Sequence, residues 1–116
     1  MNFLAVFFGG GIGSLLRYGV QLLMAPHGVP ATLAVNVVGC LLIGCLGAAG
    51  AKLGWNDAAR LLLTTGLCGG FTTFSTFGKE TAELLQDGSY GLAILYVAGS
   101  VALGVAAAAL GLWLMK

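Results

Sequence analysis

Charged side chains are scarce in this chain of 116 residues, at 8% of the total, whereas a soluble domain carries about 25%. Five basic and four acidic residues cannot cover a water-facing surface. A hydrophobic content of 59% and a mean hydropathy of +0.99 therefore exclude a soluble enzyme. The chain also has no basic arm and no acidic tail, which argues against a nucleic-acid partner. It is predicted to be an integral membrane protein embedded in a lipid bilayer.

Cysteine and histidine are scarce as well, and the apolar segments lack acidic residues. The three cysteines are odd in number and lie in apolar segments, so they are expected to be small packing residues rather than disulfide or zinc ligands. His27, between Pro26 and Gly28, is expected to be a solvated turn residue. No Asp or Glu falls inside an apolar segment, so a proton-coupled carrier would have nothing obvious to protonate.

Long apolar runs between the few charges predict four membrane-spanning helices, since about 20 apolar residues cross a hydrocarbon core of roughly 30 Å. The first run has no cationic leader, so it is expected to remain in the mature protein. The fold class is predicted to be an all-α integral membrane protein with a single transmembrane domain over residues 1–116. The approximate helices cover residues 2–24, 29–52, 58–86 with a break near 69–73, and 89–115.

The basic residues give only a weak preference for one orientation in the membrane. With four crossings, both termini and the second loop share one side, which carries Lys52, Arg60 and Lys116. The other side carries Lys79 and, if it snorkels, Arg17. A chain with so small a bias can insert both ways round. Two copies are then expected to pack antiparallel about a two-fold axis in the membrane plane.

The third segment is the most polar of the four. Its double glycine, Gly69-Gly70, and its β-branched polar run are poor material for one continuous helix and predict a break, although a kinked, purely structural helix is the alternative. Carbonyls freed around Gly69 to Thr72 would favour a cation. Two copies meeting at the break would supply four oxygens to a small hard ion such as sodium.

Two phenylalanines follow the predicted break. At a spacing of three, Phe74 and Phe77 share one face of the second half-helix. Their ring edges carry the positive part of the aromatic quadrupole and could face a small anion, though such a pair is also typical of plain packing. Amide hydrogens at the start of this half-helix favour an anion too.

Other polar groups form stripes at four-residue intervals on the second and fourth predicted helices. The stripes are Thr32, Asn36, Cys40 and Gly44, and Tyr96, Ser100 and Gly104. Their hydroxyl and amide donors could replace part of an anion's hydration shell, or could serve as interhelical glue. Arg17 either snorkels to the interface or draws an anion into a vestibule.

These segments resemble the Fluc/CrcB fluoride channel family over essentially the full chain. The most specific match is the run Gly69-Gly70-Phe71-Thr72-Thr73-Phe74-Ser75-Thr76-Phe77, followed by Glu80. Supporting matches are the Gly-Gly-x-Gly-x-x-x-Arg pattern from Gly10 to Arg17 and the run Asn36-Val37-Val38-Gly39-Cys40.

The resemblance implies a passive channel that exports cytoplasmic fluoride across a bacterial plasma membrane. It also implies a dual-topology antiparallel homodimer with two fluoride pathways and a central structural sodium ion. The sodium ligands would be the backbone carbonyls of Gly69 and Thr72. The pathway residues would be Asn36, Phe74, Phe77, Ser75, Thr76, Tyr96, Ser100 and Thr32, with Arg17 at the vestibule. One departure is Gly104, which stands where another hydroxyl is expected.

Two other functions compete with this interpretation. A small multidrug-resistance-type exporter also has four helices in about this length, but it depends on an acid in the first helix, where this chain has Arg17. A non-transporting membrane scaffold would explain the many glycines but not the polar third segment. Truncating the predicted pore side chains separates a scaffold from a channel, because a scaffold should tolerate their loss and a channel should not.

Overall fold

The computed structural model describes residues 1–24 and 28–116, so the predicted turn at His27 lies outside the described residues. The elements are α1 (Asn2–Leu23), α2 (Gly28–Leu53), α3 (Asp57–Leu61), the π-helical segment η1 (Leu62–Cys68), α4 (Gly69–Phe71), α5 (Phe74–Gln86) and α6 (Tyr90–Leu114). The segments α3, η1, α4 and α5 follow one another as a bent third helix. The predicted all-α architecture, with four helices and a broken third one, is confirmed.

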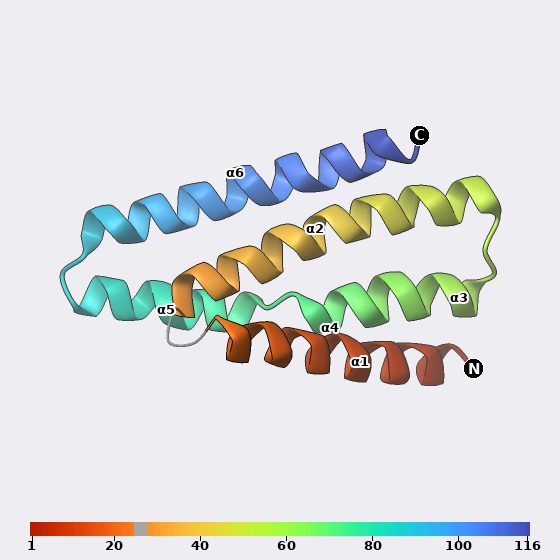
Figure 1. The fold of residues 1–116 in the computed structure, drawn as a ribbon, viewed down its shortest axis with the longest axis horizontal. Helices are drawn as coiled ribbons and strands as arrows, with labels where there is room; N and C mark the ends of the chain where they lie inside the picture. Colours follow the sequence, from red (N-terminus) through yellow and green to blue (C-terminus); the bar gives the residue numbers. More distant parts are fainter. Residues whose placement is uncertain (25–27) are drawn as a thin grey trace.

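The helices lie side by side in an elongated bundle that extends 49 Å along its longest axis (Figure 1). The long helix α2 packs along α6, while α1 packs along η1 and α4. Beyond the break, α5 reaches the opposite end of the bundle and contacts α6. Both termini and the α2–α3 connection lie at the same end, as an even number of crossings requires (Figure 1).

Glycines let these helices approach to backbone contact. An added Cβ at Gly13 of α1 would lie 2.8 Å from the amide nitrogen of Phe71, and one at Gly111 of α6 would lie 2.7 Å from that of Cys45. Neither position can therefore hold a side chain unless the backbone moves. In a membrane, where lipid tails are as apolar as the side chains, such close approach supplies the van der Waals contact between helices.

The break in the third helix lies at Thr72 and Thr73, within the predicted interval, but the double glycine does not cause it. Gly69 and Gly70 are both helical, so the expectation that the double glycine itself interrupts the helix is wrong. Gly70 instead makes room for α1, because an added Cβ there would lie 2.9 Å from the Cα of Gly10. The wider winding of η1 just before α4 was not expected, and π-helical turns are frequent at functional sites.

Three helices in the described part of the chain, α1, α2 and α6, are long and apolar enough to cross a membrane. The third helix is divided by its break into shorter pieces. Large apolar side chains face outward along the bundle, with Phe3 93% and Ile94 69% exposed. Such outer faces are suited to lipid rather than water. The protein is a multi-pass membrane protein.

Candidate functional site

The break in the third helix is held by a side chain from α2. Both residues of the break have extended backbone angles, with φ −79° and ψ 156° at Thr72 and φ −144° and ψ 115° at Thr73. The Asn36 Nδ2 donates to the Thr73 carbonyl across 3.0 Å, and the Thr73 N–H donates to Asn36 Oδ1 across 2.8 Å. One side-chain amide thus bonds both backbone polar groups of Thr73, which would be costly to leave unpaired in a membrane.

Thr73 also begins the second half of the third helix. Its hydroxyl accepts the Thr76 N–H across 3.2 Å and lies 3.0 Å from the Thr76 hydroxyl. This is the N-cap arrangement that satisfies a free amide in the first turn of a helix. The start of α5, and with it the position of Phe74 and Phe77, therefore depends on a residue that Asn36 holds in place.

A cavity of about 360 Å³ lies beside the break. The lining residues are Asn36, Gly39, Cys40, Ile43, Cys68, Gly69, Thr72, Thr73, Phe74, Phe77, Ser100, Val101 and Gly104. They come from α2, from the third helix on both sides of its break, and from α6. The fold thus gathers six of the predicted site residues around one space: Asn36, Gly69, Thr72, Phe74, Phe77 and Ser100.

The other five predicted site residues lie outside this lining. Thr32 of α2 and Tyr96 of α6 are buried. Ser75 is exposed and Thr76 is half-buried in the first turn of α5. Arg17 is half-buried in α1.

The two phenylalanine rings of the site differ in how they are covered. Their centroids are 5.8 Å apart and their planes are inclined at 55°. Phe77 is half-buried, and its centroid lies 4.9 Å from that of Tyr96 with the planes at 63°, an edge-to-face contact. Phe74 lines the cavity yet is 82% exposed. Tyr96 therefore fixes the ring of Phe77, while the ring of Phe74 is largely uncovered by the described part of the chain.

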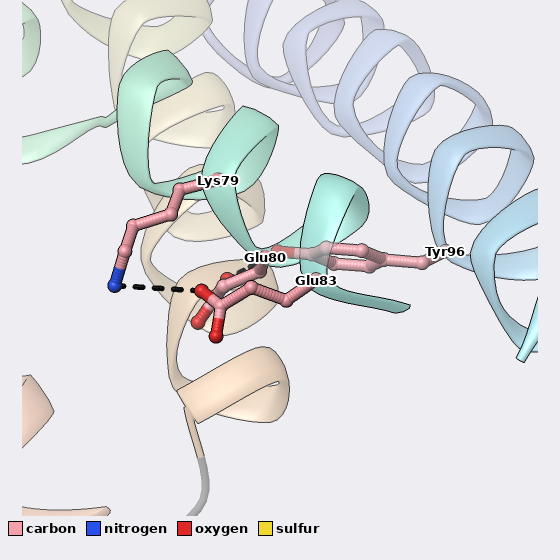
Figure 2. Close-up of polar contacts among 4 residues, drawn as sticks. All are labelled: Lys79, Glu80, Glu83 and Tyr96. Carbon is pink, nitrogen blue, oxygen red and sulfur yellow. Dashed lines mark hydrogen bonds and ion pairs between the residues drawn. The ribbon is translucent and has the colours of Figure 1, made fainter. Parts of the chain in front are cut away.

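Glu80 is a residue of this region to which sequence reasoning gave no role. Its Oε1 accepts the hydroxyl of Tyr96 across 2.9 Å (Figure 2). Its Oε2 lies at the start of α2, where an added Cβ on Gly28 would be 2.9 Å away. The amino-terminal end of a helix favours a negative charge. The sequence feature that could have indicated a role for Glu80 is its spacing of three from Phe77, which places both residues on one face of α5.

A second acid on α5, Glu83, pairs with Lys79 of the same helix rather than with a residue of α6. Lys79 Nζ and Glu83 Oε1 are 3.4 Å apart, with side chains 79% and 54% exposed (Figure 2). An exposed pair at this spacing contributes only about 0.3–0.5 kcal/mol. Of the acids on α5, Glu80 is therefore the one that links this helix to the bundle.

Two buried polar atoms have no hydrogen-bond partner within residues 1–24 and 28–116: Ser100 Oγ and Arg17 Nε. Ser100 is one of the residues that line the cavity, and its Oγ is buried there. Buried polar groups in native proteins are nearly always paired, and an exception points to a ligand, an ion or water. Ser100 Oγ is therefore a buried hydroxyl at a largely apolar lining, and it still needs a hydrogen-bond partner.

The thiol of Cys40 on α2 lies close to Gly104 on α6. An added Cβ at Gly104 would lie 3.4 Å from Cys40 Sγ, and both residues line the cavity. The S–H group is a weak donor. At this level of α6, Cys40 therefore stands close to the place where the sequence led us to expect a hydroxyl.

Replacing Tyr96 by phenylalanine is expected to lower the free energy of unfolding by about 1–3 kcal/mol, because Glu80 Oε1 loses its donor while remaining partly buried. Unfolding of the detergent-solubilised protein measures this. Tyr90→Phe is the matched control, since the Tyr90 side chain is 63% exposed at the start of α6. Equal stability of the two variants would show that the bond between Tyr96 and Glu80 contributes nothing.

A helix broken part-way along a bundle of apolar helices, beside a cavity lined by Asn36, Ser100 and two phenylalanines, defines the class. This is a small multi-pass membrane protein built around a discontinuous helix, the arrangement that membrane transport proteins use to place backbone groups beside an ion. A family model described as "CrcB-like protein, Camphor Resistance (CrcB)" matches residues 4–112. The chain belongs to this CrcB family.

Relatives of nearly the same length carry one name, fluoride-specific ion channel FluC. The relative from Phocaeicola vulgatus is 44% identical over 99% of this chain and 98% of its own. The one from Novosphingobium aromaticivorans is 47% identical over 96% of this chain and 93% of its own. A third, from a Methylobacterium species, is 44% identical over 100% of this chain and 97% of its own. The similarity extends over all four helices and the break.

Proposed function

We infer that this chain is a fluoride-specific ion channel of a bacterial cell membrane and not an enzyme. It lets cytoplasmic fluoride leave passively, down its electrochemical gradient. The observation that carries this function is the cavity at the break, where an amide, an unpaired hydroxyl and two phenyl rings meet. The near full-length similarity to fluoride-specific channels names the ion. The drug-exporter and scaffold alternatives have no comparable support.

The lining suits a small, strongly hydrated anion. Asn36 uses one of its two N–H donors on Thr73, which leaves the other for an ion. Ser100 supplies a hydroxyl, and the edges of Phe74 and Phe77 supply partial positive charge. Within residues 1–24 and 28–116, no charged side chain lines the cavity. Dehydration is thus compensated by dipoles, which bind an ion weakly enough to let it leave again.

The predicted residues outside the cavity extend the pathway or support it. Thr32, Ser75 and Thr76 are assigned as hydroxyl donors on the approaches, and Arg17 attracts the anion at the vestibule. Tyr96 serves differently, because its hydroxyl proton is engaged by Glu80. Its main contribution is to hold the ring of Phe77.

The channel is an antiparallel dual-topology homodimer with two pathways. Non-helical backbone at membrane depth must be covered by protein or line a cavity, and the uncovered ring of Phe74 and the exposed Gly69 lie next to it. A second copy placed over the break would cover both. The small difference in basic residues between the two sides permits insertion in both orientations.

The backbone carbonyls of Gly69 and Thr72 would hold a sodium ion where the two third-helix breaks meet. The donor set fits a hard cation, because Gly69 is exposed beside the break and the extended backbone at Thr72 turns away from the helical path. When bound, sodium supplies a positive charge that holds the two chains together at their most polar point. It takes no part in moving fluoride.

Reconstitution tests the channel function directly. Purified protein is placed in liposomes loaded with potassium fluoride or potassium chloride, and efflux is followed with ion-selective electrodes after a potassium ionophore is added. Fast release of fluoride with chloride retained is the expected result. A folded dimer that releases neither ion, or both equally, contradicts the function.

Removing sodium is expected to lower the melting temperature of the dimer by several degrees. An ion at 100 times its dissociation constant stabilises the folded state by about 2.7 kcal/mol, and that contribution disappears with the ion. Melting is measured in sodium chloride and in N-methylglucamine chloride at equal ionic strength. Identical melting temperatures in the two salts would rule out a structural sodium.

A further inference from the structure

We propose that Asn36 and Thr73 are positioning residues that free the carbonyls of Gly69 and Thr72 for the cation. The inference rests on the sodium site of the proposed function and adds how the chain prepares it. Its basis is the pattern of hydrogen bonds at the break. Two side-chain oxygens accept the N–H groups that would otherwise donate to these two carbonyls.

The register of the α-helix identifies the captured groups. In a continuous helix each N–H bonds to the carbonyl four residues earlier. The partner of the Gly69 carbonyl would be the Thr73 N–H, which instead donates to Asn36 Oδ1 across 2.8 Å. The partner of the Thr72 carbonyl would be the Thr76 N–H, which instead donates to Thr73 Oγ1 across 3.2 Å. Each predicted ligand loses its helical donor to a side-chain oxygen.

The carbonyls on either side of this turn are already occupied. The Cys68 carbonyl accepts both the N–H and the hydroxyl of Thr72, each across 3.0 Å. The Thr73 carbonyl accepts Nδ2 of Asn36 across 3.0 Å. Carbonyls available to a cation are thereby confined to the turn from Gly69 to Thr72. Hydrogen bonding thus delimits the site on both sides.

Asparagine is well suited to this role because its side chain carries the same donor and acceptor as a peptide group. Gly39, three residues later on α2, is buried, and an added Cβ there would collide with the Thr72 side chain. The break is therefore docked on α2 at two neighbouring points. Without Asn36, the Thr73 N–H has no fixed acceptor, and it competes with the cation for the Gly69 carbonyl.

The side chain of Asn36 therefore has two separable functions. Its oxygen withdraws the Thr73 N–H from the cation site, while the N–H that Thr73 does not use is assigned to the fluoride pathway. Aspartate keeps an acceptor oxygen in the same place but has no N–H and carries a charge of the wrong sign for an anion. Alanine removes both functions. Comparison of these two variants separates a positioning role from a role as a pore ligand.

The experiment measures the sodium-dependent rise in melting temperature and the hydrogen exchange of the Thr73 amide, with fluoride efflux in parallel. Asn36→Ala is expected to lose the sodium response and to exchange the Thr73 amide about tenfold faster, as the loss of one buried hydrogen bond implies. Asn36→Asp is expected to keep the sodium response and the slow exchange while its fluoride efflux falls. Asn56→Ala is the matched control, since Asn56 bonds a backbone N–H at the exposed start of α3.

A second pair of variants covers the case in which Asn36→Ala does not fold. Thr73→Ala removes the oxygen that captures the Thr76 N–H, and it is expected to weaken the sodium response. Thr73→Ser keeps that oxygen and is expected to retain the response. Equal sodium responses in these two variants would contradict the proposal.

The remaining outcomes separate this inference from the channel function. An unchanged sodium response in Asn36→Ala, or an equal loss in Asn36→Asp, would overturn the positioning role. If the wild-type chain conducts no fluoride but shows the expected sodium pattern, the channel function fails and the positioning role stands. A wild-type chain without any sodium response would overturn the inference, and efflux alone would then decide the channel function.

Discussion

Replacing Phe74 by leucine is expected to reduce fluoride efflux from loaded liposomes at least about 100-fold while the dimer still forms. Leucine keeps the apolar bulk but has no aromatic quadrupole, so it cannot present a positive edge to the ion. A hundredfold loss corresponds to about 2.7 kcal/mol in the barrier for conduction. Because the Phe74 ring is 82% exposed within its own chain, its loss should not unfold the protomer.

The control for this variant is Phe7→Leu, which changes a ring that is 71% exposed on α1. Its efflux is expected to match that of the wild type. Fluoride-electrode traces measure the function, and size-exclusion chromatography in detergent checks that each variant is a dimer. Normal efflux in Phe74→Leu would mean that the pair of phenylalanines at the break is ordinary packing.

Replacing Gly13 by alanine is expected to give the largest loss of stability, about 3 kcal/mol in the free energy of unfolding. The added Cβ would lie 2.8 Å from the Phe71 nitrogen and 3.1 Å from the Gly70 carbonyl carbon. These are backbone atoms, so no rotamer change relieves the clash, and overpacking of this kind costs about 1–3 kcal/mol. The backbone shift that relieves the clash would move α4, and the break with it.

Gly11→Ala is a matched control in the same helix. An added Cβ at Gly11 has no other atom within 4 Å, and alanine favours the helix over glycine by about 1 kcal/mol. Its stability is expected to equal or exceed that of the wild type. Unfolding of both variants in detergent gives the difference. Equal losses at Gly11 and Gly13 would show that close contact of α1 with the third helix is not what stabilises the bundle.

Much of the fold could be predicted because it depends on segment properties. Apolar runs between charges give the helices, and the run from Thr72 to Thr76 is polar and β-branched enough to suggest a break. Of the two causes assigned to the break, the double glycine was wrong, since Gly69 and Gly70 remain helical. Glycine has a low helix propensity, but here α1 packs against α4, and the missing side chain of Gly70 leaves room for the backbone of α1.

The side-chain contacts at the site could not be predicted in the same way. Asn36 was identified as a polar group on a stripe, yet its bonds to Thr73 join residues 37 positions apart. Glu80 was visible only as part of a motif, and its role depends on Tyr96, 16 positions later on another helix. Spacing shows which residues share a face of one helix. It does not show which residue of a second helix lies opposite.

The sequence by itself determined that this is a membrane protein of four helices, because the cost of placing charge and unpaired backbone in lipid is a property of each segment. Its resemblance to the CrcB family came from the motif that runs from Gly69 to Phe77. Only the tertiary structure decided which backbone groups at the break are bonded and which are free. The bond from Asn36 to Thr73 forms when α2 lies against the third helix in one register. A hydrogen bond depends on distances of a few tenths of an ångström, which only the packed helices fix.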